Sequence, residues 1–475
     1  MVPRRKVAIW VVPLLVFLLL FGSFIRGVEA LTIEEEKKLG KKILLEIEKS
    51  VELVKDPTFQ TFLDRMGRSL VAQVGPTSFD FKFYLINTSE PNAYAIPGGY
   101  IFVTTGLIVL AENEQEIAGV LSHEISHVMG RHVAQMIERS KRLSIATLAA
   151  MIAGVLLGGG GKGSEAAAAM AVATAEALTL KYTRENEVDA DQNSLQYMIK
   201  AGYDPNGIIT FLNRMNKISL ASAPKIPAYL STHPAIENRI SLLETLLQIG
   251  PKFMGPFKLI GNFRKIQVKA FVEERETHVS ITHFQSLIDA NPQEMDGFYG
   301  LGLAYRKMGR LDKSAEVFQK AHALAPNDSD IRKELGVIYF LSGKLDLAIE
   351  NLEAARSSPL TGTSQNEDLL DLYYLGRGYQ EKGDLGKALP LFLKVQKEMP
   401  EFVDVYHNLG SVYGRMGQKG LSHFYFAKHF KLRGEGNNAL LHFRKAFEWL
   451  EKGSPEKEEA QREIKELTQT KRDKS

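Results

Sequence analysis

The 475-residue chain contains no cysteine. This absence excludes disulfide bonds, thiolate metal ligands, cysteine nucleophiles and a lipidated N-terminal cysteine. The net charge is also small, because the 59 lysine and arginine residues are nearly balanced by 56 aspartate and glutamate residues. Four of these bases and one acid lie in the first 30 residues, so 59 − 4 and 56 − 1 leave 55 of each in the remainder. Without a basic field, the chain has no electrostatic basis for binding nucleic acid.

Long hydrophobic runs are scarce, and only residues 7–25 approach the length of a membrane span. Basic residues 4–6 precede this run, and a Val-Glu-Ala segment at residues 28–30 follows it. A basic start, an apolar centre and a small-residue end are typical of a secretory signal. We therefore predict that residues 1–30 are a signal peptide and that the chain is exported to a bacterial periplasm. The alternative is an uncleaved anchor in the inner membrane, which would also export the remainder.

Residues 31–250 are predicted to form a mainly helical domain with a small sheet. Thr32 and Glu35 have the spacing of a capping box at the start of an amphipathic helix. Residues 81–86 read as a strand, and a turn at residues 97–99 leads into a second strand over residues 100–104. Asn113 and Glu116 begin a long helix whose apolar residues recur at helical spacing.

The second half of the chain repeats itself. Leu-Gly pairs ending at Gly302, Gly336, Gly376 and Gly410 are each followed by tyrosine after three residues and by glycine after seven. This pattern resembles tetratricopeptide repeats, which stack into an α-solenoid. We predict a linker at residues 251–261, repeats over residues 262–450 and a charged tail or capping helix at residues 451–475. The first copy is degenerate, and a phase slip predicts that one helix near residues 420–431 serves two neighbours.

One segment of the long helix carries a metal-binding pattern. His123 and His127 are four residues apart, so both imidazoles lie on one helical face and can reach one ion. Zinc is the usual metal for this HExxH spacing. Glu124 lies beside the first histidine, where it can take a proton from water at the metal.

Two interleaved pairs of acids follow about 60 residues later and offer a third ligand. Glu187 and Asp191 are four residues apart, as are Glu185 and Asp189. One carboxylate of a pair could bind the metal while the other accepts the free N–H of a ligating histidine. Spacing alone does not choose between the two pairs.

Four motifs in order resemble a known family. They are residues 92–99 (Asn-Ala-Tyr-Ala-Ile-Pro-Gly-Gly), the histidine motif, Glu187 with Ala190-Asp191, and residues 231–234 (Ser-Thr-His-Pro) with Arg239-Ile240. Over residues 32–248 the chain is similar to the zinc metallopeptidase family of the HtpX heat-shock protease and the CAAX prenyl endopeptidases. The resemblance implies a zincin-type fold with one zinc ion per chain.

The resemblance also assigns roles to the acids and suggests partners. It implies that His123, His127 and Glu187 are the metal ligands and that Asp191 is the acidic partner. A signal, a peptidase domain and repeats in this order are similar to exported family members that act on outer-membrane β-barrel proteins. The expected partners are therefore unfolded or misassembled outer-membrane proteins, with the β-barrel assembly machinery contacted through the repeats.

The remaining histidines are interpreted by their positions. His233 could bind the fourth metal position in a resting state, or donate to the oxyanion of the transition state. His132, five residues after His127, is expected on another side of the helix and is read as structural. Five histidines that belong to the repeat region show no ligand spacing, namely His322, His407, His423, His429 and His442.

An apolar and glycine-rich segment separates the two metal motifs. Residues 143–157 are apolar, residues 158–161 are four glycines, and residues 166–177 are rich in alanine. A buried helical hairpin is one reading of this segment. The alternative is a mobile lid, or a hairpin that contacts the membrane, because both arms lead directly to the metal motifs.

Together these features predict peptide-bond hydrolysis by a zinc endopeptidase. An extended substrate is expected to add a strand beside Gly99, Tyr100, Ile101 and Phe102. The alternative function is a chaperone or assembly scaffold in which the repeats do the main work and proteolysis is secondary.

Overall fold

The computed structural model describes residues 31–139, 144–157, 182–221, 227–250, 256–357 and 369–472. The predicted signal peptide and most of the segment between the metal motifs lie outside these ranges. No helix among the described residues is long and apolar enough to cross a membrane.

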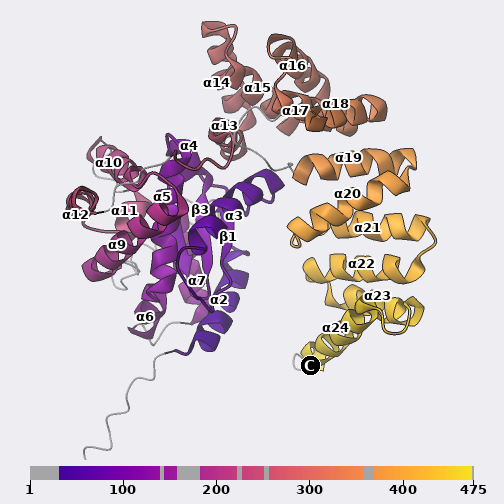
Figure 1. Cartoon of the computed structure of the whole chain (residues 1–475), viewed down its shortest axis with the longest axis horizontal. Coiled ribbons are helices and arrows are strands. Elements are labelled where there is room, and N and C mark those ends of the chain that lie inside the picture. Colours follow the sequence, from indigo (N-terminus) through magenta and orange to yellow (C-terminus); the bar gives the residue numbers. More distant parts are fainter. Residues whose placement is uncertain are drawn as a thin grey trace, which may run out of the picture.

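The N-terminal part is mainly helical, as expected, and surrounds a small sheet (Figure 1). The predicted capping box is present, since Thr32 and Glu35 bond each other's backbone at the start of α2. Its helices are α2 (Ile33–Ile47), α3 (Pro57–Val71), α4 (Thr105–Leu110), α5 (Glu114–Met129), α6 (His132–Arg139), α7 (Ile145–Leu156), α9 (Arg184–Ala201), α10 (Asn206–Ala221), α11 (Ala228–Thr232) and α12 (Ile236–Ile249).

The sheet contains one strand more than the sequence suggested. Its strands are β1 (Lys82–Ile86), β2 (Ala93–Ile96) and β3 (Tyr100–Thr104), in the order β1-β3-β2. The turn at residues 97–99 folds β2 antiparallel onto β3, while β1 pairs with β3 in parallel. Because both sides of β3 are occupied, the expectation that Gly99 to Phe102 form a substrate-accepting edge is wrong.

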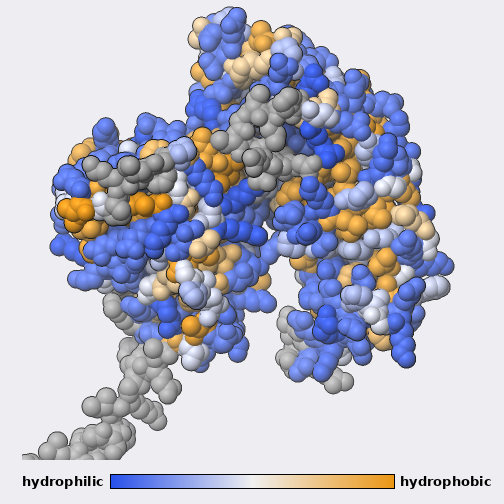
Figure 2. Space-filling model, in the orientation of Figure 1, coloured by the Kyte–Doolittle hydropathy of each residue, from blue (hydrophilic) through white to orange (hydrophobic). Residues whose placement is uncertain are grey.

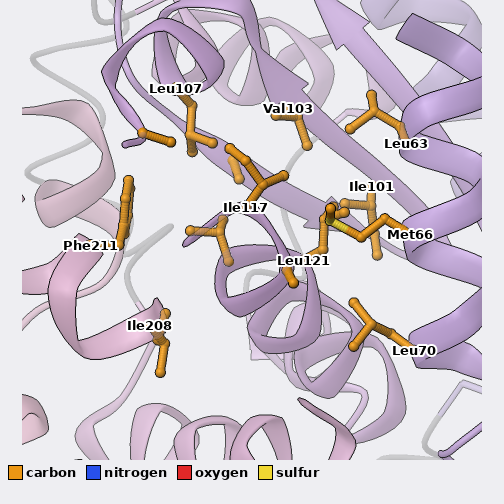
Figure 3. Close-up of a cluster of buried hydrophobic side chains, with 14 of the residues drawn as sticks. Leu63, Met66, Leu70, Ile101, Val103, Leu107, Ile117, Leu121, Ile208 and Phe211 are labelled. Atoms are coloured by element: carbon orange, nitrogen blue, oxygen red, sulfur yellow. The ribbon is translucent and has the colours of Figure 1, made fainter. Parts of the chain in front are cut away.

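The core of this part lies where α5 crosses α3, α10 and the sheet. Figure 3 shows side chains from these elements converging, among them Met66, Ile101, Leu121 and Phe211. The crossing of α5 and α10 is close, because a Cβ atom added to Gly119 would lie 2.8 Å from the Ile208 backbone. Glycine at this position lets α5 sit centrally, and all its residues from Glu114 to Val128 are buried.

The C-terminal part is a solenoid of paired helices (Figure 1). Its helices are α13 (Phe263–Glu274), α14 (Thr277–Ala290), α15 (Met295–Lys307), α16 (Leu311–Leu324), α17 (Ser329–Leu341), α18 (Leu345–Ser357), α19 (Leu369–Lys382), α20 (Leu385–Glu398), α21 (Val403–Arg415), α22 (Lys419–Leu432), α23 (Gly436–Trp449) and α24 (Pro455–Arg472). Helix α22 packs on both α21 and α23, as the phase slip predicted.

The first repeat helix belongs to the N-terminal core by packing. Phe263, Ile266 and Ala270 of α13 are buried in the same hydrophobic cluster as α3 and α5. The Gln267 amide donates to carbonyl oxygens at the end of α4, including that of Val109 at 2.9 Å. The predicted linker therefore marks where the repeat pattern begins, but the first helix after it packs with the N-terminal part.

The two parts meet again at α3, which lies beside α19. There the Lys82 ammonium lies 2.7 Å from the Glu401 carboxylate. Figure 2 shows a largely hydrophilic surface and an open gap between the N-terminal part and the last repeats.

Candidate metal centre

Helix α5 carries two metal-ligand candidates on one face. Its start is fixed by Asn113, whose side chain accepts from the backbone N–H groups of Gln115 and Glu116. Four residues apart on this rigid helix, His123 and His127 bring their Nε2 atoms to 3.0 Å from each other. Both side chains are fully buried.

Helix α9 brings an acid to the same point. Thr183 and Asn186 form a capping box that starts the helix three residues before Glu187. The Glu187 carboxylate oxygens lie 3.4 Å from Nε2 of His123 and 3.4 Å from Nε2 of His127. Glu187 is buried, whereas Glu185 is exposed. The spacing in the sequence did not distinguish the two pairs of acids, but in the structure Glu187 lies beside the histidines and Glu185 does not.

His233 joins this cluster from the end of α11. Its Nδ1 atom lies 3.4 Å from Nε2 of His123 and 3.1 Å from Oε1 of Glu187. His233 is fully buried, and Pro234 and Ala235 follow it into α12. Ala235 adopts a left-handed conformation with φ of 63°, a strained turn that is typical of functional sites.

The four residues fit a metal ion. One ligand atom from each of His123, His127, Glu187 and His233 lies within 4.8 Å of the others. A tetrahedral zinc site with bonds of about 2.0–2.1 Å has ligand atoms about 3.3–3.4 Å apart. The contacts above, from 3.0 to 3.4 Å, are close to that geometry. Three nitrogens and one carboxylate are also a donor set that zinc accepts.

Glu124 lies next to these ligands, with its Oε1 atom 3.4 Å from Nε2 of His233. Neither of its buried carboxylate oxygens has a hydrogen-bond partner among the described residues. Burial raises the pKa of the Glu124 carboxyl above its ordinary value. A buried acid at such a point is suited to proton transfer, because its proton affinity is increased.

Asp191 and Arg239 support the cluster from behind. Oδ1 of Asp191 lies 3.0 Å from Nδ1 of His123, as the sequence led us to expect of an acidic partner. Arg239 donates to both Asp191 oxygens, from Nε at 2.8 Å and from Nη2 at 2.7 Å. Its Nη1 atom also lies 2.8 Å from Oε2 of Glu187. Burial opposes ionisation of Glu187, but Arg239 holds the pKa of this carboxyl well below its ordinary value.

In the sequence, Arg239 was recognised only as part of a motif and had no predicted role. Its signal was present, because Arg239 lies between Ile236, Ile240 and Leu243 on the apolar face of α12. An arginine on a buried face needs carboxylate partners, and two acids of the metal centre supply them.

Aromatic rings enclose the centre. Tyr182 stacks on His127 with ring centroids 3.6 Å apart, and Tyr229 stacks on His233 with centroids 4.5 Å apart. Tyr94 of β2 stacks on Tyr182 in turn. The hydroxyl groups of all three tyrosines are buried and lack hydrogen-bond partners among the described residues. The centre is therefore closed to solvent on the sides that these residues cover.

His132 does not lie where the sequence suggested. Helix α5 ends at Met129, so His132 is not on another side of the same helix. Its Nδ1 atom lies 2.9 Å from Nδ1 of His127, which places it directly behind a ligand.

Comparison with known proteins agrees with this geometry. Residues 57–247 match peptidase family M48, and residues 296–328 match the tetratricopeptide repeat. Residues 57–247 form an M48 peptidase domain. The predicted resemblance to a metallopeptidase family, followed by tetratricopeptide repeats, is thereby confirmed, and the cluster of His123, His127, Glu187 and His233 lies within the M48 domain.

Several curated proteins are similar to this chain over part of its length. A putative beta-barrel assembly-enhancing protease of Vibrio cholerae is 30% identical over 290 residues, which cover 60% of this chain and 59% of that protein. The beta-barrel assembly-enhancing protease of Yersinia pestis is 32% identical over 212 residues, covering 44% and 43%. Mitochondrial metalloendopeptidase OMA1 of Schizosaccharomyces pombe is 30% identical over 187 residues, covering 39% and 52%.

The matches thus span between 43% and 59% of the length of these relatives. Among solved structures, YrrB, described as a TPR protein, is 18% identical with a TM-score of 0.31, and covers 38% of this chain and 91% of that one.

Proposed function

We propose that this chain is a zinc-dependent endopeptidase of the bacterial periplasm, with one zinc ion held by His123, His127 and Glu187. One observation carries the proposal. Ligand atoms from two helices and a loop converge within 4.8 Å, and the buried carboxylate of Glu124 lies beside them. Metalloproteases require this combination of an ion site and an adjacent general base.

Each residue has a distinct task in hydrolysis. Zinc bound at this position supplies a Lewis acid that makes water more acidic and polarises a peptide carbonyl. Glu124 takes the proton of the attacking water and later delivers it to the leaving amine. Asp191 accepts the Nδ1–H of His123 and so orients Nε2 toward the ion. Arg239 fixes Asp191 and keeps Glu187 ionised.

An extended peptide would bind at β2 rather than at β3. β2 is an edge strand that packs on α5, and the backbone N–H of Ala95 lies close enough to Glu124 to favour its charged form. Peptide recognition at a sheet edge uses free backbone groups of this kind. All four residues of β2 are buried, so access requires the segments that cover it to move.

The relatives suggest the biological setting. Proteins named beta-barrel assembly-enhancing protease are 30–32% identical to this chain over 212–290 residues. We infer that its clients are unfolded or misassembled outer-membrane proteins, and that the repeats contact the β-barrel assembly machinery.

A Glu124→Gln variant tests the mechanism. We expect it to retain zinc, because all ligands remain, and to lose cleavage of an unfolded protein substrate, because glutamine cannot accept the proton. Zinc content and the rate of substrate cleavage are the measurements. Full cleavage by the zinc-loaded variant would reject the proposed mechanism.

The same variant separates the protease from the scaffold alternative. If proteolysis is the main function, the full-length Glu124→Gln chain should fail to support outer-membrane protein assembly in a host that lacks the native protein. Normal assembly with the inactive chain would favour a chaperone or scaffold built on the repeats.

A further inference from the structure

The end of α5 is built in an unusual way. The helix ends at Met129, and Arg131 then adopts a left-handed conformation with φ of 54°, which is uncommon for a residue other than glycine. Glu36 of α2 holds this residue, since Nε of Arg131 donates to its buried carboxylate at 2.7 Å. His132 begins α6 immediately afterwards. The break between the two helices places His132 beside the metal-ligand candidate His127.

Gly130 leaves room for the imidazole of His132. A Cβ atom added to Gly130 would lie 2.3 Å from Nε2 of His132. The backbone of Gly130 does not itself require glycine, because its φ of −73° and ψ of −6° suit any residue. The missing side chain therefore serves the placement of His132, which is only 5% exposed.

In this position His132 contacts a metal ligand directly. Its Nδ1 atom lies 2.9 Å from Nδ1 of His127, and the two rings meet edge to face with centroids 5.0 Å apart. A histidine that binds a metal through Nε2 carries its proton on Nδ1 and donates it to a neighbouring acceptor. For His123 that acceptor is Asp191. For His127 the structure offers the Nδ1 atom of His132.

We propose that His132 is a positioning residue that accepts the Nδ1–H of His127 and thereby aims Nε2 of His127 at the metal. This inference rests on the proposed metal site. Once Nδ1 of His132 accepts, its Nε2 atom must carry the proton of the neutral ring. That atom lies 3.4 Å from Oδ2 of Asp189, an acid from the other of the two interleaved pairs. The side chain of Asp189 is 52% exposed, so its influence on the ring should be weak.

The test measures zinc affinity of the full exported chain by competition with a chelator at constant pH. His132→Ala should bind zinc about 10- to 100-fold more weakly, as is typical when the partner of a ligating histidine is lost. His132→Asn should restore most of the affinity, because its amide oxygen takes the place of Nδ1. Gly130→Ala should also weaken binding, since its new methyl group displaces the ring. Asp189→Asn, the matched control, should change affinity little.

Further measurements separate positioning from simple structural support. The thermal unfolding midpoint of each zinc-free variant reports stability, and the visible spectrum of the cobalt-substituted protein reports ligand geometry. Equal weakening by alanine and asparagine at position 132 would overturn the inference, as would wild-type zinc affinity in both His132→Ala and Gly130→Ala. If His123→Ala bound zinc as tightly as the wild-type chain, the proposed metal site itself would be wrong, and this inference would fail with it.

Discussion

Two glutamates two positions apart illustrate how much depends on a single residue. Glu187 points into the metal centre and is buried, while Glu185 lies on the exposed side of α9. Both sit in the first turn of the same helix, so their local surroundings in the sequence are nearly the same. The neighbours that distinguish them, His123 and Arg239, come from distant parts of the chain.

Glu187→Gln should therefore lower the zinc content of the purified protein far more than Glu185→Gln. Glutamine removes the charge that stabilises the ion, whereas a neutral side chain at position 185 is simply hydrated. Metal analysis of the two variants after identical purification provides the measurement. Equal zinc occupancy would refute the assignment of Glu187 as a ligand.

We propose that His233 takes the position at the ion that a substrate or water would need. Its Nδ1 atom completes the four-atom cluster, and its Nε2 atom lies 3.4 Å from Oε1 of Glu124. Zinc with four protein ligands is a closed site, so this arrangement favours restraint over catalysis.

We predict that His233→Ala raises the basal rate of cleavage of a fixed peptide, because the fourth position becomes open. If His233 instead stabilises the oxyanion, its loss should lower the rate by about 10²–10³. The two roles therefore predict opposite changes in the cleavage rate in one assay. A large drop in rate at unchanged zinc content would reject the restraint role.

At the scale of elements, α5 is anchored at its first residue by an acid. Glu114 is 2% exposed, and its Oε1 atom accepts from the backbone N–H of Ile260 at 2.9 Å. Its Oε2 atom has no hydrogen-bond partner among the described residues. Burial raises the pKa of this carboxyl to about 7, although bonds from the backbone at Ile260 and Gly261 oppose the shift.

The raised pKa makes stability depend on pH. The folded chain holds the proton of the Glu114 carboxyl more tightly than the unfolded chain does. Protonated Glu114 therefore contributes to the free energy of unfolding in full below about pH 4.5, and this contribution is lost as pH rises through about 7. Glu114→Gln keeps an acceptor for Ile260 without the charge. We expect the variant to be more stable than wild type at pH 8, by up to about 3 kcal/mol, and similar to it at pH 5. Denaturation curves at both pH values test this, and an equal difference at the two would contradict it.

At the scale of the whole molecule, the solenoid and the N-terminal part share an ion pair whose cation is buried. The Lys269 ammonium of α13 lies 2.8 Å from Asp56, which also caps α3 by accepting from Thr58 N–H. Lys269 is 6% exposed. Burial raises the pKa of Asp56, but Lys269 outweighs it and leaves this pKa below its ordinary value. The second ion pair between the parts, Lys82 with Glu401, is considerably more exposed.

Lys269→Met should destabilise the chain by about 1–3 kcal/mol, because it leaves Asp56, whose side chain is 24% exposed, without its cation. Lys82→Met is the matched control and should cost less than about 1 kcal/mol. Asp56→Asn in the Lys269→Met background should recover part of the loss, since asparagine still caps α3. Chemical denaturation of the full chain measures all three, and similar losses for Lys269→Met and Lys82→Met would contradict a larger contribution from the Lys269–Asp56 pair.

Features with a local cause could be read from the sequence. The capping box at Thr32, the start of α5 at Asn113 and the shared face of His123 and His127 depend on residues within one or two helical turns. The repeats were visible for the same reason, because each copy packs on its neighbours and repeats the same residues to do so.

Features with a distant cause were decided by the tertiary structure. The central position of β3 depends on β1 and β2 pairing with it from both sides, and a strand pattern does not reveal its neighbours. Arg239 gained its role from two acids on another helix, and α13 joined the M48 core although its pattern belongs to the repeats. His132 lies against His127 across a break between α5 and α6 at Arg131, where a contact with Glu36 stabilises a conformation that local preference disfavours.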